Sequence, residues 1–194
     1  EYPEMSASQK TATKNTPTIG ETIMSYSAGG DSEINGELRR LSAGGKPIDF
    51  ARINPTLAMK IAALDVATRV DLRDKPIVVY RGVDNTQTMK AIDSMGVGST
   101  FTEHAFTSTS TQQVRARTFL TYQPDPSKES DGAKVFMQIT TRQGIPIKSL
   151  SLHASENEIL LPRGARFKLT SKEWRMDENL SPELHVKLEH LETN

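Results

Sequence analysis

Hydrophobic residues in the first third of the chain recur at the three- and four-residue spacing of helices. Ile34, Leu38 and Leu41 follow this spacing and predict a helix over residues 31–42. A shorter helix is expected over residues 18–26, because its first threonine and the glutamate three residues later have the spacing of a capping box. A pair of glycines follows each helix and is expected to end it.

A third, longer helix is predicted to begin at Asn54 and to end before Lys75. Asn54 is a favoured N-cap residue, and the proline after it suits the first turn of a helix. Leu57, Ile61 and Leu64 then continue an apolar face at helical spacing. The first third of the chain is therefore expected to be helical.

From residue 76 onward the pattern changes to short, β-branched or alternating segments. Residues 76–82 form an apolar run typical of a buried strand, and residues 184–191 alternate between apolar and polar positions. Further strands are expected at residues 101–110, 134–141, 147–152, 157–161 and 165–171, with helical segments at 86–95 and 111–122. Helices first and mostly strands afterwards favour an α+β fold over a doubly wound parallel sheet. The sheet is expected to be largely antiparallel or mixed, in one layer or as two packed sheets.

Length and composition favour a single domain. The chain has 194 residues, of which 36% are hydrophobic, enough for a sizeable core. Residues 1–17 are polar and are expected to form a flexible tail or linker before a domain over residues 18–194. Because the first residue is glutamate rather than methionine, we expect a processed chain or a fragment of a longer protein.

Charge balance and missing residue types exclude several classes of protein. The 24 Lys and Arg residues balance 24 Asp and Glu residues, so the chain lacks the basic field of a general nucleic-acid-binding protein. The absence of cysteine excludes disulfide frameworks, thiolate zinc sites and cysteine nucleophiles. No apolar stretch approaches the roughly 20 residues of a membrane span. Neither a G-x-G-x-x-G motif after a strand nor a P-loop is present.

Two glutamates that are two positions apart, Glu156 and Glu158, precede an apolar run and form the most unusual segment of the chain. In an extended conformation they share one face and lie about 6.5–7 Å apart along the strand. Paired carboxylates beside a glycosidic carbon can stabilise an oxocarbenium ion and activate a nucleophile. An ordinary solvated strand edge accounts for the same pair, so both interpretations stay open on these residues alone.

Two further segments are candidates for ligand contact. Arg81 closes the first predicted strand with a planar guanidinium suited to phosphate, and Gly82 after it allows a ligand to approach the backbone. Ser108 lies in a run of hydroxyl side chains that can orient a carboxylate or a ribose hydroxyl. A surface arginine beside a turn glycine, and a polar strand end or helix N-cap, are the alternatives for these segments.

The four histidines do not pair at a zinc-binding spacing on any predicted helix. They are His104, His153, His185 and His190. We interpret them as surface or strand-face residues and expect no metal site, although His153 stands close to the glutamate pair.

The order and separation of these motifs resemble the signature of the mono-ADP-ribosyltransferases, in the cholera-toxin-like and actin-toxin-like branch of that superfamily. Three parts of the chain carry the resemblance. They are Arg81, the aromatic-x-Ser-Thr-Ser segment at 106–110, and the Glu-x-Glu segment at 156–158, which Ile-Leu-Leu-Pro-Arg-Gly completes. The stretch from Tyr26 to Arg39 resembles the family's tyrosine, isoleucine-asparagine and leucine-arginine pattern. The resemblance implies an ADP-ribosyltransferase fold of two packed, roughly perpendicular sheets, with helices at the N-terminal side and NAD in the cleft between the sheets.

The resemblance also implies a role for each matched residue. Glu158 matches the catalytic glutamate that stabilises positive charge as the glycosidic bond breaks. Glu156 matches the glutamate that orients the acceptor and helps to deprotonate it. Arg81 is expected to hold the NAD phosphates, and Gly82 to bind the nicotinamide amide through its backbone. Ser108 is expected to fix Glu158 and the ribose.

Neighbouring residues complete the implied site. Phe119 is expected to stack on nicotinamide, while Arg115 or Arg117 either contacts a phosphate or stays solvated on its helix. Relatives that modify arginine often have an aromatic residue three positions before the first glutamate, in the loop that recognises the protein substrate. His153 occupies that position here, so we expect His153 and Glu156 to contact the substrate, but the target of any relative does not transfer.

The resemblance predicts an arginine-specific mono-ADP-ribosyltransferase, because a glutamate at position 156 resembles the arginine-modifying members. NAD is the expected co-substrate and a protein arginine the expected acceptor, without a metal, a nucleic acid or a membrane span. We expect a monomer that acts as a secreted or injected bacterial toxin or effector. The alternatives are an NAD glycohydrolase, in which water replaces the acceptor, and a non-catalytic binding module that keeps the fold.

Overall fold

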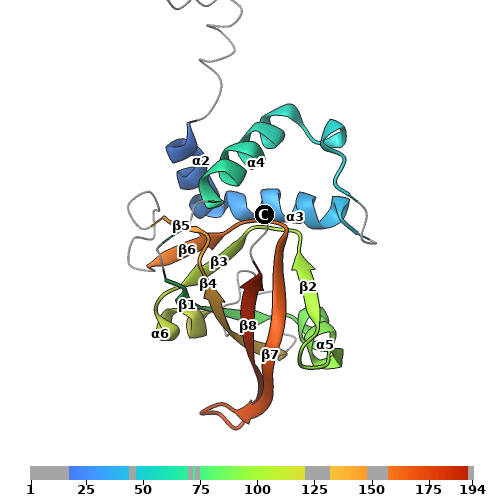
Figure 1. Ribbon diagram of the computed structural model, residues 1–194, viewed down its shortest axis with the longest axis vertical. Helices are drawn as coiled ribbons and strands as arrows, with labels where there is room; N and C mark the ends of the chain where they lie inside the picture. Colours follow the sequence, from blue (N-terminus) through green and yellow to red (C-terminus); the bar gives the residue numbers. More distant parts are fainter. Residues whose placement is uncertain are drawn as a thin grey trace, which may run out of the picture.

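A computed structural model describes residues 18–43, 47–69, 72, 75–120, 132–147 and 157–191 of the chain. Three helices from the first third of the chain lie together at one end of the molecule, and the strands form the body beneath them (Figure 1). This order of helices followed by mostly strands confirms the α+β prediction. The predicted tail at 1–17 and nearly all of the polar loop at 123–132 lie outside the described residues.

The three N-terminal helices begin close to the predicted positions and the first two also end there, but the third ends at Thr68, well before the predicted end next to Lys75. They are α2 (Ile19–Ser25), α3 (Asp31–Leu41) and α4 (Pro55–Thr68). The capping box of α2 is formed, since the Thr18 hydroxyl accepts from the Glu21 amide at 3.2 Å and the Glu21 carboxylate accepts from the Thr18 amide at 2.8 Å. Gly29, with φ at +104°, allows the tight turn between α2 and α3.

Eight strands form one hydrogen-bonded sheet in the order β2-β7-β8-β4-β1-β3-β6-β5. Their bounds are β1 Ile77–Asp84, β2 Thr100–Glu103, β3 Thr107–Ser110, β4 Lys134–Thr141, β5 Ile145–Pro146, β6 Glu158–Leu161, β7 Ala165–Met176 and β8 Pro182–Leu191. Only β4 and β8 pair in parallel, and all other pairs among the described strands are antiparallel. The expected mixed, mostly antiparallel sheet is therefore present.

The sheet has two parts that meet between β1 and β3. The larger part consists of β2, β7, β8, β4 and β1, and the smaller part of β3, β6 and β5 lies beneath the helices (Figure 1). The register between β1 and β3 consists of the single pair Tyr80↔Ser110, whereas β1 and β4 pair at all eight positions of each strand. The two packed sheets of the prediction correspond to these two parts of one continuous sheet.

Two apolar clusters hold these layers together. One cluster joins the two parts of the sheet and includes Val79, Met137, Ile159, Leu161, Phe167 and Val186. The other joins the smaller part to the helices and includes Ile23, Leu38, Ile61, Leu64, Phe106 and Leu160. Because side chains alternate along a strand, β6 contributes to both clusters. Full burial of each large side chain contributes about 1.5–3 kcal/mol.

One of the two short helices and one long strand depart from the predicted bounds. Helix α5 (Thr86–Ser94) agrees with its prediction, but α6 spans only Gln113–Thr118 of the expected 111–122. β5 precedes the strand expected at 147–152, most of which lies outside the described residues. β7 continues to Met176 because its polar second half pairs with β8 beyond a bulge at Leu169/Ser171.

Candidate active site

The expected site residues of β1 and β3 lie where the two parts of the sheet separate. After the Tyr80↔Ser110 pair, β1 continues with Arg81 and Gly82. Arg81 Nη1 donates a hydrogen bond to the carbonyl oxygen of Ser108 at 2.7 Å, although 27 residues separate the two along the chain. The guanidinium and the hydroxyl-rich segment are therefore in direct contact.

Glu158 comes to the same region through the pairing of β6 with β3. It is the first residue of β6, and its backbone is in register with Ser110. The Thr109 hydroxyl donates to the Ile159 carbonyl oxygen at 2.7 Å, which fixes this register from the side chain as well. Three adjacent strands thus carry the arginine, the serine and the glutamate.

The residues expected to contact the acceptor, Glu156 and His153, lie outside the described residues, so their roles stay predictions. Glu158 itself makes a polar contact within the chain, and β6 holds its backbone between β3 and β5.

A buried hydrogen-bond chain connects the helices to β3. Tyr26, which is 1% exposed, accepts from Asn35 Nδ2 at 2.8 Å, and Asn35 Oδ1 accepts from the Phe106 amide at 3.0 Å. Burial raises the pKa of Tyr26 to about 12, while a hydrogen bond with the Ser108 side chain opposes the shift. The phenol is therefore protonated at neutral pH and holds Ser108 against α3.

Sequence reasoning gave Tyr26 and Asn35 no role beyond the helical pattern that carries the resemblance. A signal was present, because Asn35 is an amide beside Ile34 and three positions before Leu38, on the apolar side of its helix. A buried amide at such a position needs hydrogen-bond partners, and here it finds them on β3.

Charges of both signs surround Arg81. Burial lowers the pKa of Arg81, and the charge of Glu103 is the largest influence in the opposite direction. Arg39 Nε lies 3.4 Å from the Glu103 carboxylate. Asp31 is a second acid that raises the pKa of Arg81, so two acids and two guanidinium groups make up this charge cluster. A guanidinium in such a cluster suits a phosphate-containing ligand. Glu103 was missed by the sequence analysis, since one acid in an alternating strand carries no distinctive signal.

Gly82 lies directly against α6. A Cβ atom at this position would lie 2.3 Å from the Ala116 carbonyl oxygen and 3.0 Å from Leu120 Cγ. The approach of α6 therefore requires glycine here, whether or not a ligand binds the backbone. Phe119 caps the C-terminus of α6 and is 41% exposed, so part of its ring is open to a partner. Its stacking on nicotinamide stays a prediction.

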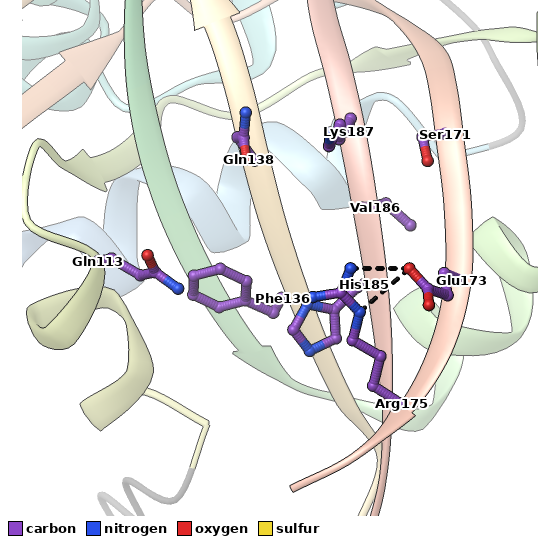
Figure 2. Close-up of a pocket in the computed structure, with 9 residues that line it drawn as sticks. All are labelled: Gln113, Phe136, Gln138, Ser171, Glu173, Arg175, His185, Val186 and Lys187. Carbon is purple, nitrogen blue, oxygen red and sulfur yellow. Dashed lines mark hydrogen bonds and ion pairs between the residues drawn. The ribbon is translucent and has the colours of Figure 1, made fainter.

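A cavity of about 330 Å³ lies away from these residues, on the side of the larger sheet part that bears Phe136 and His185 (Figure 2). None of its lining residues is an expected site residue. Gly82 pairs with Phe136 and therefore shares its face of the sheet. Arg81 directly precedes Gly82 on β1 and projects from the opposite face, because side chains alternate along a strand. Arg117, on the Phe136 side, pairs with Glu183 at 3.0 Å while 39% of its side chain stays exposed, and its contact with a phosphate stays a prediction.

The described part of the chain holds neither a candidate metal site nor a candidate membrane span. Within these ranges no group of three or more His, Asp and Glu side chains is arranged to hold a metal ion. Of the helices in the same ranges, none combines the length and the apolar character that crossing a bilayer requires.

Comparison with known proteins gives one family and many similar folds. The family model described as ADP-ribosyltransferase exoenzyme matches residues 5–187. No curated protein matches the chain. Plx2a, an ADP-ribosyltransferase toxin from Paenibacillus larvae, is 20% identical with a TM-score of 0.64, over 94% of this chain and 90% of that chain.

Two similar structures contain small molecules. The ADP-ribosyltransferase Vis from Vibrio splendidus, in complex with agmatine, is 21% identical with a TM-score of 0.65, over 97% of this chain and 87% of that chain. Exoenzyme S from Pseudomonas aeruginosa, bound to carba-NAD and human 14-3-3 protein beta, is 16% identical with a TM-score of 0.64, over 88% of this chain and 72% of that chain. These identities establish a shared fold.

Proposed function

The chain belongs to the ADP-ribosyltransferase exoenzyme family, and on this premise we propose that it transfers ADP-ribose from NAD to an arginine side chain of a protein, with release of nicotinamide. One observation carries the proposal. Arg81, the Ser108 segment and Glu158, which the sequence separates widely, stand on three adjacent strands where the sheet divides, with Arg81 bonded to Ser108. The carba-NAD complex of exoenzyme S supports NAD as the co-substrate of this fold.

We assign the bond-breaking step to Glu158. The bond between C1′ of the nicotinamide ribose and the nicotinamide nitrogen breaks, and its electron pair leaves with nicotinamide. Positive charge then develops on the ribose, and a fixed carboxylate beside it stabilises the transition state. Removal of one such preorganised group typically costs about 2.7–4 kcal/mol. The Ser108 hydroxyl, held by Tyr26, is the group that we assign to orient this carboxylate.

We assign the diphosphate of NAD to the guanidinium groups around Arg81. Arg81 and Arg39 both lie in the electrostatic surroundings of Glu103, and charge-assisted hydrogen bonds from a guanidinium to a phosphate are strong. A planar guanidinium can bind two phosphate oxygens at once. This contact fixes the nucleotide while the nicotinamide end lies at Gly82.

We assign the acceptor chemistry to Glu156. A guanidinium is a poor nucleophile while it is fully protonated. Attack of its nitrogen on C1′ forms a C–N bond and releases a proton, which the Glu156 carboxylate accepts. Agmatine, which is bound to Vis, carries a guanidinium group, and that complex supports an acceptor of this class. His153 is the residue that we expect to contact the protein around the target arginine.

The similar structures include a toxin from Paenibacillus larvae and an exoenzyme from Pseudomonas aeruginosa, and they support a comparable place of action for this protein. We propose that it acts as a monomer after secretion or injection into a target cell, where both NAD and the protein acceptor are present.

Incubation of the protein with labelled NAD and a cell lysate tests the proposal. Mass spectrometry of the labelled proteins is expected to place ADP-ribose on arginine, and label on another residue type would refute the arginine acceptor. A Glu156→Ala variant separates transfer from hydrolysis: it is expected to keep nicotinamide release in water and to lose label on protein. Release of free ADP-ribose alone by the wild type would instead identify a glycohydrolase.

A further inference from the structure

A buried carboxylate on β8 binds α6 from the side of the sheet opposite Arg81. Glu183 is 1% exposed, and both of its oxygens accept from Arg117 Nη1, at 3.0 and 3.3 Å. His185 Nε2 lies 2.6 Å from the same carboxylate. Because a carboxylate oxygen can only accept, this nitrogen carries a proton. The contact between Arg117 and Glu183 spans 66 residues of sequence.

The Arg117 guanidinium is held by an aromatic ring as well. Its Cζ atom lies 4.5 Å from the centre of the Phe136 ring. That ring stacks on Tyr80 at 6.0 Å and contacts His185 at 5.4 Å, and Figure 2 shows Phe136 and His185 side by side. A guanidinium over an aromatic face is a favourable arrangement even at a partly exposed site. Arg117 is thus fixed by a charge and by a ring.

Helix α6 depends on such contacts for its position. It has six residues and no side-chain hydrogen bond at its N-cap, so it is too short to be stable in isolation. Its buried apolar contacts are Ala116 and Leu120, which pack on the same Phe136 ring. The interactions of Arg117 with Glu183 and Phe136 add to this packing and connect α6 to β8 and β4.

The position of α6 determines what surrounds Gly82. The Ala116 carbonyl oxygen stands where a Gly82 side chain would be, and Phe119 follows directly at the end of the helix. We propose that Arg117 and Glu183 are positioning residues of the transferase reaction. Their ion pair, which is buried on the Glu183 side, holds α6 against β1, so that the Gly82 backbone and the Phe119 ring keep the arrangement that nicotinamide requires. This inference rests on the proposed function.

A second arginine that pairs with a carboxylate and lies over an aromatic ring provides a matched control. Arg163 pairs with Asp65 at 2.6 Å and lies 4.8 Å from the centre of the Phe50 ring, so it repeats the chemistry of Arg117 without contact with α6. The test compares Arg117→Met, the conservative Arg117→Lys and the control Arg163→Met. Amide hydrogen exchange of α6 and the kcat and KM of nicotinamide release from NAD are measured below the unfolding transition of each variant.

We expect Arg117→Met to speed exchange of the α6 amides by about tenfold or more while the core strands stay protected. Its KM for NAD is expected to rise, or its kcat to fall, by about tenfold, and Arg117→Lys to recover part of the loss. Arg163→Met is expected to lose comparable thermal stability and to keep both constants within about twofold of the wild type.

Two results would overturn the inference. One is unchanged α6 exchange in Arg117→Met, and the other is faster exchange with wild-type kcat and KM. A wild type that fails to release nicotinamide contradicts the proposed function instead. The exchange measurement distinguishes this case, because it reports the anchoring of α6 without any turnover of NAD.

Discussion

At the scale of single residues, Gly82 shows how packing can dictate a residue that the sequence suggests for ligand binding. Its missing side chain leaves room for the Ala116 carbonyl oxygen of α6, which would lie 2.3 Å from a Cβ atom. The approach of α6 therefore explains the glycine after Arg81 by itself, and the binding of nicotinamide to its backbone stays a proposal.

A Gly82→Ala substitution is expected to lower the free energy of unfolding by about 1–3 kcal/mol, because the added methyl group must displace α6. Gly36 on α3 is the matched control: a Cβ atom there has no neighbour within 4 Å, and Gly36→Ala is expected to stabilise the protein by about 0.4–1 kcal/mol. Denaturant unfolding of both variants measures the difference. Equal stability of Gly82→Ala and wild type would show that α6 does not lie on β1.

Tyr26 offers a second test at this scale. Tyr26→Phe keeps the ring that packs edge-on against Phe106 but removes the hydroxyl that binds Asn35 and Ser108. The unpaired Asn35 amide is expected to cost about 1–3 kcal/mol of unfolding free energy. Tyr80→Phe, which keeps a ring stacked on Phe136, is the control and is expected to cost less. Equal midpoints of the two variants in urea would contradict the buried chain.

At the scale of elements, the helices were predictable because their signals are local. The Thr18 and Glu21 capping box and the Asn54 cap appear in the structure with the expected hydrogen bonds. α6 was predicted too long, because its length depends on contacts with β1 and β8 rather than on its own sequence. The ion pair between Arg117 and Glu183 has no local signal at all.

The pairing of β4 with β8 buries a titratable group. The His190 ring on β8 lies 2.8 Å from the Thr141 hydroxyl of β4 through Nδ1, and its Nε2 is buried without a hydrogen-bond partner among the described residues. Burial lowers the pKa of His190 from its usual 6.5. The unfolded chain therefore binds a proton below about pH 6.5 that the folded chain excludes, and stability falls as the pH drops through this range.

The thermal midpoint is accordingly expected to fall between about pH 7.5 and pH 5, with a shallower fall in His190→Gln. Burial also lowers the pKa of His185, which adds to the fall in both proteins, so the comparison of slopes isolates His190. If the thermal midpoint falls equally steeply with pH in wild type and in His190→Gln, then His190 does not cause this pH dependence.

At the scale of the whole molecule, the division of the sheet creates the candidate site. Two parts of one sheet diverge after a single register pair, and the helices fix the smaller part through Tyr26 and Asn35. The sequence predicted the α+β class and the motif residues, since both follow from patterns along the chain. It could not predict that Arg81 bonds to the backbone of Ser108, or that Glu103 pairs with Arg39 and acts on Arg81, because these interactions join residues that lie far apart along the chain.

Nicotinamide release by a Glu158→Gln variant is the most direct test of the transferase proposal. The substitution keeps the size of the side chain and removes its negative charge, so the rate is expected to fall by about 10²–10³-fold. Folding and NAD binding serve as controls: NAD at 100 times its Kd is expected to stabilise variant and wild type alike, by about 2.7 kcal/mol. Loss of the rate with retained NAD binding is the result that we predict. A Glu158→Gln protein that releases nicotinamide as fast as the wild type would contradict the assignment of this residue, and with it the proposed chemistry of the site.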